Sequence, residues 1–203
     1  MKLVNLFTPL IVVALLLSAC GDSSVTRQDV VDFMVDTIQE EELMVAEVVS
    51  REALVEFWGC VIDEIKAVSG DSYETILDEF KMAAEDDSNE TNYEVILNEE
   101  ATGCLVDSRE VLEGSMNAFF PEDMQVDLSG VDNFHREALA VMFSWSMSIF
   151  MLEEMLDDAG YCMADYVADN SGDSHRDILI DFLYDESAYD VALEEASEAC
   201  LDF

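Results

Sequence analysis

The sequence predicts an all-α protein, and three observations support that prediction. Proline, which breaks helices, occurs only at Pro9 and Pro121. No stretch of strict apolar and polar alternation is bounded by hairpin turns, so strands are not expected. Apolar residues instead recur at spacings of three and four, which is the period of amphipathic helices.

The helical period is clear over residues 27–58, where Ser50 is a candidate break. Thr26 is a suitable N-cap, and Asp29 places an acid in the first turn, where the helix dipole favours it. Further helices are expected at residues 60–68, 73–85, 92–114, 132–157, 160–169, 175–186 and 188–201.

One expected helix is apolar on every side. Residues 138–152 contain only Ser144, Ser146 and Ser148 as polar residues. Such a helix is buried on every side, and its 15 residues are too few to cross a bilayer. We therefore expect a buried central helix around which the rest of the protein packs.

An internal duplication is the most informative feature of the sequence. Cys60 and Cys162 are each followed nine residues later by Ser-Gly-Asp-Ser. Residues 60–80 match residues 162–182 at 9 of 21 positions without a gap. The repeated turn suits a helix end followed by a new helix start, because glycine favours the C′ position and Ser or Asp the N-cap.

A second matched block extends the duplication. Residues 93–105 match residues 189–201 at 6 of 13 positions, and each block ends in Cys-Leu. We interpret residues 29–114 and 132–203 as two tandem copies of one helical unit, joined by a linker of residues 115–131.

Four cysteines belong to these copies, and an even number in an exported protein indicates disulfides. Three pairings are possible. We favour Cys60 with Cys104 and Cys162 with Cys200, because a bridge inherited from one ancestral unit must close within that unit. Each would contribute about 4 kcal/mol on the chain-entropy model. Metal ligation is disfavoured, since no two cysteines form a Cys-x-x-Cys pair.

The N-terminus has the pattern of a secretory signal. Lys2 supplies one positive charge, and an apolar run over residues 3–17 follows it. A helix of that run covers only about 22 Å, short of a bilayer core of about 30 Å. We expect residues 1–19 to be a cleaved signal peptide rather than a membrane span.

The residues that end this segment, Leu17-Ser18-Ala19-Cys20, resemble the lipobox of bacterial lipoproteins. The resemblance covers residues 1–20 alone. It implies that Cys20 is lipidated and that residues 20–28 form a lipidated N-terminus and short tether. Gly21 follows in place of the aspartate that retains such proteins in the inner membrane, which implies an outer-membrane location facing the periplasm.

The charge balance restricts the partners. Cleavage removes Lys2 and leaves 7 basic against 47 acidic residues, a formal charge of −40. Such a surface repels phosphate backbones, so nucleic acid is excluded, and membrane contact is expected only through the lipid. A basic envelope protein and divalent cations are the candidate partners. Salt should stabilise the fold because it screens the repulsion between carboxylates. Mild acid should also stabilise it, because crowding raises the pKa values of the carboxyls in the folded state.

No catalytic, cofactor-binding or metal-binding residues are predicted. His135 and His175 each lie near an expected helix start, where an exposed or capping role is the ordinary one. The chain has no glycine-rich phosphate loop, nucleophile elbow or zinc-protease motif. We therefore expect a noncatalytic, membrane-tethered interaction or structural module of the cell envelope, with a cation- or small-ligand-binding lipoprotein as the alternative.

Overall fold

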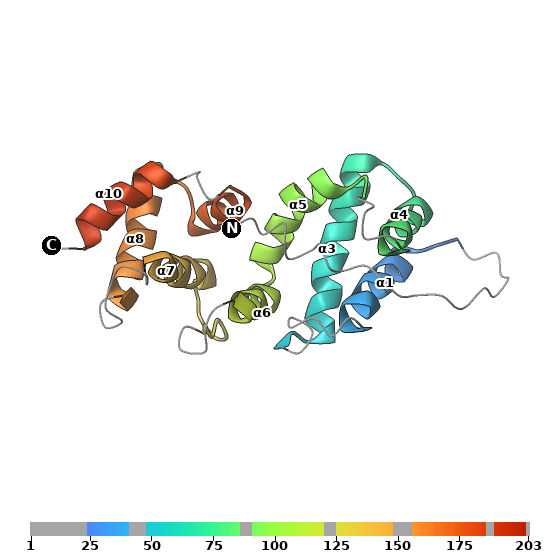
Figure 1. Cartoon of the computed structure of the whole chain (residues 1–203), viewed down its shortest axis with the longest axis horizontal. Coiled ribbons are helices and arrows are strands. Elements are labelled where there is room, and N and C mark those ends of the chain that lie inside the picture. Colours follow the sequence, from blue (N-terminus) through green and yellow to red (C-terminus); the bar gives the residue numbers. More distant parts are fainter. Residues whose placement is uncertain are drawn as a thin grey trace. The chain divides into compact units, whose positions relative to one another are not determined.

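The all-α prediction is confirmed by the structure, a computed structural model that describes residues 24–40, 48–85, 91–119, 125–147, 156–185 and 189–201. Within these ranges all regular secondary structure is helical (Figure 1). The chain divides into two compact units, residues 1–111 and 112–203. The predicted signal peptide and Cys20 lie outside the described residues.

The first unit is built around one long helix. Helix α3, Arg51–Ser69, packs against α1, Arg27–Glu40, and against α5, Glu94–Asp107. Helix α4, Tyr73–Glu85, packs on α1. The fully buried large side chains that join these helices are Val30, Val31, Leu54, Ile62, Ile65 and Ile76.

Helix α3 begins where the sequence predicts a break, at Ser50, and continues through Cys60, where a new helix was expected. Ser50 is the N-cap, and its side chain accepts a hydrogen bond of 3.2 Å from the backbone N–H of Ala53. The break at Ser50 is therefore confirmed. The separate helix expected at residues 60–68 is wrong, because α3 continues through Cys60 until Gly70 ends it.

The single helix expected at residues 92–114 is also wrong. It is divided at Ser108, whose N–H donates to the carbonyls of Cys104 and Leu105. Helix α6, Arg109–Phe119, follows at once. The expected linker of residues 115–131 thus begins inside a helix.

Beyond α6, the described part of this linker is held by side chains. The amide of Asn117 accepts from Val126 N–H at 2.7 Å and donates to Val126 carbonyl at 2.8 Å. The N–H of Leu128 donates to the carboxylate of Glu113 at 2.8 Å. Leu128 and Val126 are buried in consequence.

The second unit repeats the helix order of the first. Helix α7, Phe134–Met147, packs most extensively on α8, Leu156–Ser171, and α9, His175–Tyr184, packs on both. Helix α10, Asp190–Cys200, packs on α8. Helices α1, α3, α4 and α5 therefore correspond to α7, α8, α9 and α10, and α6 has no counterpart among the described helices.

Close packing of α7 on α8 depends on Gly160. A Cβ at this position would lie 2.3 Å from the carbonyl oxygen of Ala140 on α7. Only glycine permits that approach without moving the backbone.

Helix α7 covers residues 138–147 of the expected central helix, and residues 148–152 lie outside the described part. Ala138, Leu139 and Phe143 are fully buried. Trp145 is 41% exposed, so within its own unit the helix is not buried on every side. Among the described residues, no helix has the length and apolarity that a membrane crossing requires.

Candidate functional site

The two disulfides are those that the duplication predicted. Cys60 is bonded to Cys104 and Cys162 to Cys200, with Cα atoms 5.9 and 5.8 Å apart. Each bond joins the second helix of its unit to the last matched helix, so the two bonds occupy equivalent places.

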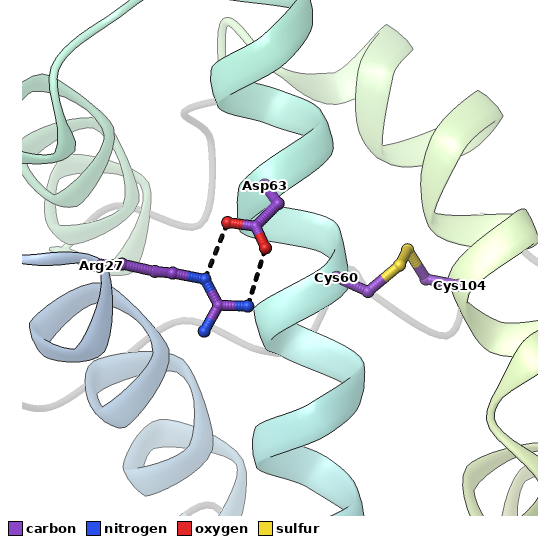
Figure 2. The surroundings of a disulfide bond; sticks show 4 residues. All are labelled: Arg27, Cys60, Asp63 and Cys104. Atoms are coloured by element: carbon purple, nitrogen blue, oxygen red, sulfur yellow. Dashed lines mark hydrogen bonds and ion pairs between the residues drawn. A yellow bond between two sulfur atoms is a disulfide. The ribbon is translucent and has the colours of Figure 1, made fainter.

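An arginine–aspartate pair recurs beside the disulfide in both units. In the first, Nε and Nη2 of Arg27 donate to the two carboxylate oxygens of Asp63 at 2.7 and 2.8 Å. In the second, Arg136 donates to Asp165 in the same way, at 2.6 Å for both bonds. Figure 2 shows the first pair and the Cys60 disulfide leaving α3 in different directions, toward α1 and toward α5.

The pairs shift the pKa values of Arg27, Arg136 and Asp165. The hydrogen bonds from Arg136 lower the pKa of the Asp165 carboxyl below its ordinary value, and the side chain of His175 lowers it further. The hydrogen bond to Asp63 raises the pKa of Arg27, and the one to Asp165 raises the pKa of Arg136. The second pair thus holds both of its members charged over a wider pH range than in the unfolded chain.

Two further carboxyls have resolved shifts, and both go in the same direction. Hydrogen bonds from Thr26 lower the pKa of Asp29, and those from Ser129 lower the pKa of Asp127. The expectation that crowding raises carboxyl pKa values is wrong for these two and for Asp165, because specific hydrogen bonds outweigh general repulsion there.

The two pairs differ in what lies against the guanidinium. In the first unit the neighbour is Gly59, where a Cβ would lie 2.5 Å from Nη2 of Arg27. In the second it is the ring of Tyr161, whose centroid lies 4.7 Å from the guanidinium carbon of Arg136. The hydroxyl of Tyr161 donates to Glu137, so the second unit holds a larger network.

A second difference lies at the residue after the Ser-Gly-Asp-Ser turn. Tyr73 in the first unit contacts Lys66, whose ammonium lies 4.5 Å from the ring centroid. His175 takes this place in the second unit, with Nε2 3.3 Å from an oxygen of Asp165. His175 begins α9 as predicted, but it is half-buried. His135, near the start of α7, is half-buried as well, with its ring 4.0 Å from that of Phe134.

The repeated turns have the geometry that their sequence predicted. Gly70 and Gly172 have φ of 75° and 82°, in the left-handed region. The hydroxyls of Ser72 and Ser174 each accept an N–H three residues later at 3.2 Å, which caps α4 and α9. Both turns are therefore helix stops and restarts.

A buried tyrosine fixes each turn from the side. Tyr93 donates to the carboxylate of Asp71 at 2.9 Å. The hydroxyl of Tyr189 lies 3.3 Å from a carboxylate oxygen of Asp173 and 3.0 Å from one of Asp181. Burial, and next these hydrogen bonds, raise the pKa of both phenols above their ordinary value.

Sequence comparison alone missed the relation between Arg27 and Arg136. The buried residues of α1 at Val30, Val31, Met34 and Val35 correspond in spacing to Leu139, Ala140, Phe143 and Ser144 of α7. In this register the two arginines are equivalent, although the helices share almost no residue identities. The signal that could have revealed this relation is the matched pair Asp63 and Asp165 on the neighbouring helices.

The bonds described above join the helices within each unit. Among the described residues, no group of three or more His, Cys, Asp or Glu side chains has a geometry suited to a metal ion. Two further basic side chains contact neighbours in their own unit: Arg51 lies 2.7 Å from Asp36, and Lys66 donates to the Asp71 carbonyl at 2.9 Å.

Most of the described acids are exposed to solvent. On α10, Glu194, Glu195 and Glu198 are exposed, and the helix contains no basic residue.

No protein-family model matches the chain, and neither a curated protein nor a solved structure matches it.

Proposed function

We propose that the protein is a noncatalytic lipoprotein of the cell envelope that is tethered through Cys20 and presents an acidic, twofold-repeated helical surface to a basic partner protein. The observation that carries the proposal is that arginine side chains form ion pairs within the protein. Arg27, Arg51 and Arg136 are ion-paired within their own units, while most described carboxylates remain exposed. The surface available to a partner is therefore strongly negative, which favours a cationic surface on that partner.

The sequence of residues 1–20 supports the lipid tether. The covalent and ionic bonds within each unit support a rigid surface on that unit. Each unit is closed by one disulfide and one bidentate ion pair. A surface held in this way pays little ordering entropy on binding. It suits a docking platform in an oxidising compartment, where disulfides persist.

The test is salt-dependent capture of a partner by the purified, lipidated protein. A first variant replaces Glu194, Glu195 and Glu198 of α10 with Gln. A control variant, Ala199→Ser, changes the same exposed face without altering its charge. Cross-linking in intact envelopes, followed by mass spectrometry, identifies what each form contacts.

We expect a basic protein whose capture is lost at about 0.5 M NaCl, where the screening length falls to a few ångströms. Capture should be weakened by the triple Gln variant and unchanged by Ala199→Ser. A captured protein that is itself acidic, or capture that is insensitive to salt and to the three substitutions, would contradict the proposal.

A further inference from the structure

The two disulfides differ in their access to solvent. In the first unit Cys60 is half-buried and Cys104 is only 4% exposed. In the second unit Cys162 is exposed and Cys200 is half-buried. Thiol–disulfide exchange requires a thiolate to reach a sulfur atom, so the second bond is the more open to attack.

The helix held by the exposed bond buries fewer of its described side chains than the matched helix of the first unit. Tyr189 and Leu201, which flank α10, are buried, as are Tyr93 and Leu105 at the equivalent places of the first unit. Val191 is 71% exposed, much like its counterpart Val95 at 67%. Within α10 itself, Ala196 is the one described side chain that is buried, so the disulfide contributes much to the attachment of this helix to α8.

The matched helix of the first unit is held differently. Besides Cys104, helix α5 buries Ala101, Leu105 and Val106. It is followed directly by α6, which begins at Arg109. Breaking its disulfide would not by itself free the helix.

We propose that the Cys162–Cys200 bond is a redox-responsive latch, which a dithiol reductant opens to release α10 while the Cys60–Cys104 bond stays closed. A thiolate of the reductant attacks Sγ of Cys162 and displaces the thiolate of Cys200. The second thiol of the reductant then attacks the mixed disulfide and displaces Cys162. Two electrons and two protons pass to the two cysteines, and the reductant leaves as its own disulfide.

The charges near this bond favour a neutral reductant. Asp158 is exposed one helical turn before Cys162, and Glu198 is exposed close to Cys200. An anionic thiol such as glutathione is repelled by these carboxylates, whereas a neutral dithiol is not.

The first experiment treats the oxidised protein with dithiothreitol without denaturant, quenches with iodoacetamide at intervals, and maps the alkylated cysteines. We expect Cys162 and Cys200 to be alkylated at least about tenfold faster than Cys60 and Cys104, because their bond is the more accessible to the attacking thiolate. Equal rates, or earlier reduction of Cys60–Cys104, would overturn the proposal.

The second experiment tests release of the helix by hydrogen exchange in the variant Cys162→Ser with Cys200→Ser. We expect protection to fall over residues 191–201 and to stay within about threefold of the parent protein in α7, α8 and α9. Loss of protection through the whole unit would show a structural bond, and retained protection in α10 would show no release. Either result refutes the latch. The matched variant Cys60→Ser with Cys104→Ser should leave α10 protected.

Discussion

Arg136 contacts Asp165 through two hydrogen bonds of 2.6 Å, and the pair links the first helix of the second unit to the second helix. Arg27 and Asp63 form the same link in the first unit. Helix order, turn geometry and disulfide position all repeat around these two pairs, so the duplication extends to how each unit is held together.

Replacing Arg136 with Lys should destabilise the protein by about 0.5–1 kcal/mol, because lysine cannot make the bidentate contact and the half-exposed pair is screened by water. A double-mutant cycle with Asp165→Asn, measured by urea unfolding, isolates the pairwise energy. Additive effects of the two substitutions would contradict the geometry.

Acid should weaken this same pair. The pKa of Asp165 is lowered from 3.8 in the folded protein, so the unfolded chain binds the proton more readily. The contribution is complete above about pH 5 and is lost as the pH falls through the folded pKa. Stability of the Asp165→Asn variant should therefore fall less than that of the parent between about pH 5 and pH 3. Parallel pH curves would contradict the assigned direction.

The raised pKa values of the buried phenols imply that stability falls as the pH rises into the alkaline range. Replacing Tyr189 with Phe should cost about 1 kcal/mol at neutral pH, since the phenol of this largely buried residue hydrogen-bonds to carboxylate. The pKa of this phenol is raised above 10.0 in the folded protein. Its contribution to stability is therefore complete below about pH 10, where the unfolded chain begins to ionise, and is lost as the pH rises toward the folded pKa. Unfolding midpoints of parent and variant should converge at about pH 11. A constant gap from neutral pH upward would show that the phenol ionises equally in both states.

Much of this organisation could be predicted from the sequence, and the residues concerned explain why. Cys60, Cys162 and the Ser-Gly-Asp-Ser turns are rigidly spaced on one helix and its end, so their match survives without gaps. The disulfide pairing followed because a duplicated bond must close within each copy.

What could not be predicted depends on packing across helices. Arg27 and Arg136 lie on helices that preserve only the spacing of their buried residues, which sequence identity does not detect. The division at Ser108 likewise has no proline or glycine to mark it. The larger network of Tyr161 and Glu137 requires the positions of α7 and α8 to be known.

The repeated turns supply a test with an internal control. Gly172→Ala should destabilise the protein by about 1 kcal/mol, because alanine is strained at the φ of 82° found there. Gly103→Ala, in helix α5, should instead be neutral or stabilise by up to about 1 kcal/mol, since a Cβ there meets no atom within 4 Å. Thermal unfolding of both variants measures the contrast, and equal effects would refute it.

Charge repulsion predicts that salt stabilises the fold. The formal charge of −39 for the whole chain acts over tens of ångströms at about 10 mM salt and is screened within roughly 8 Å at about 0.15 M. The melting temperature should rise with NaCl, and Ca²⁺ and Mg²⁺ should act alike and without saturation. A melting temperature that does not change with NaCl would show that the carboxylates are already paired with nearby positive groups. Saturable stabilisation by micromolar Ca²⁺ alone would favour the cation-binding alternative.

The proposed tether at Cys20 determines where the acidic surface is presented, so its chemistry is the most direct test. Mass spectrometry of the N-terminal peptide of protein extracted from membranes measures it. We expect the mature chain to begin at Cys20 with a diacylglycerol on its thiol, and Cys20→Ser to abolish detergent partitioning. A chain that retains Met1, or a processed chain with an unmodified Cys20 thiol, would contradict the proposal of a lipid-anchored envelope protein.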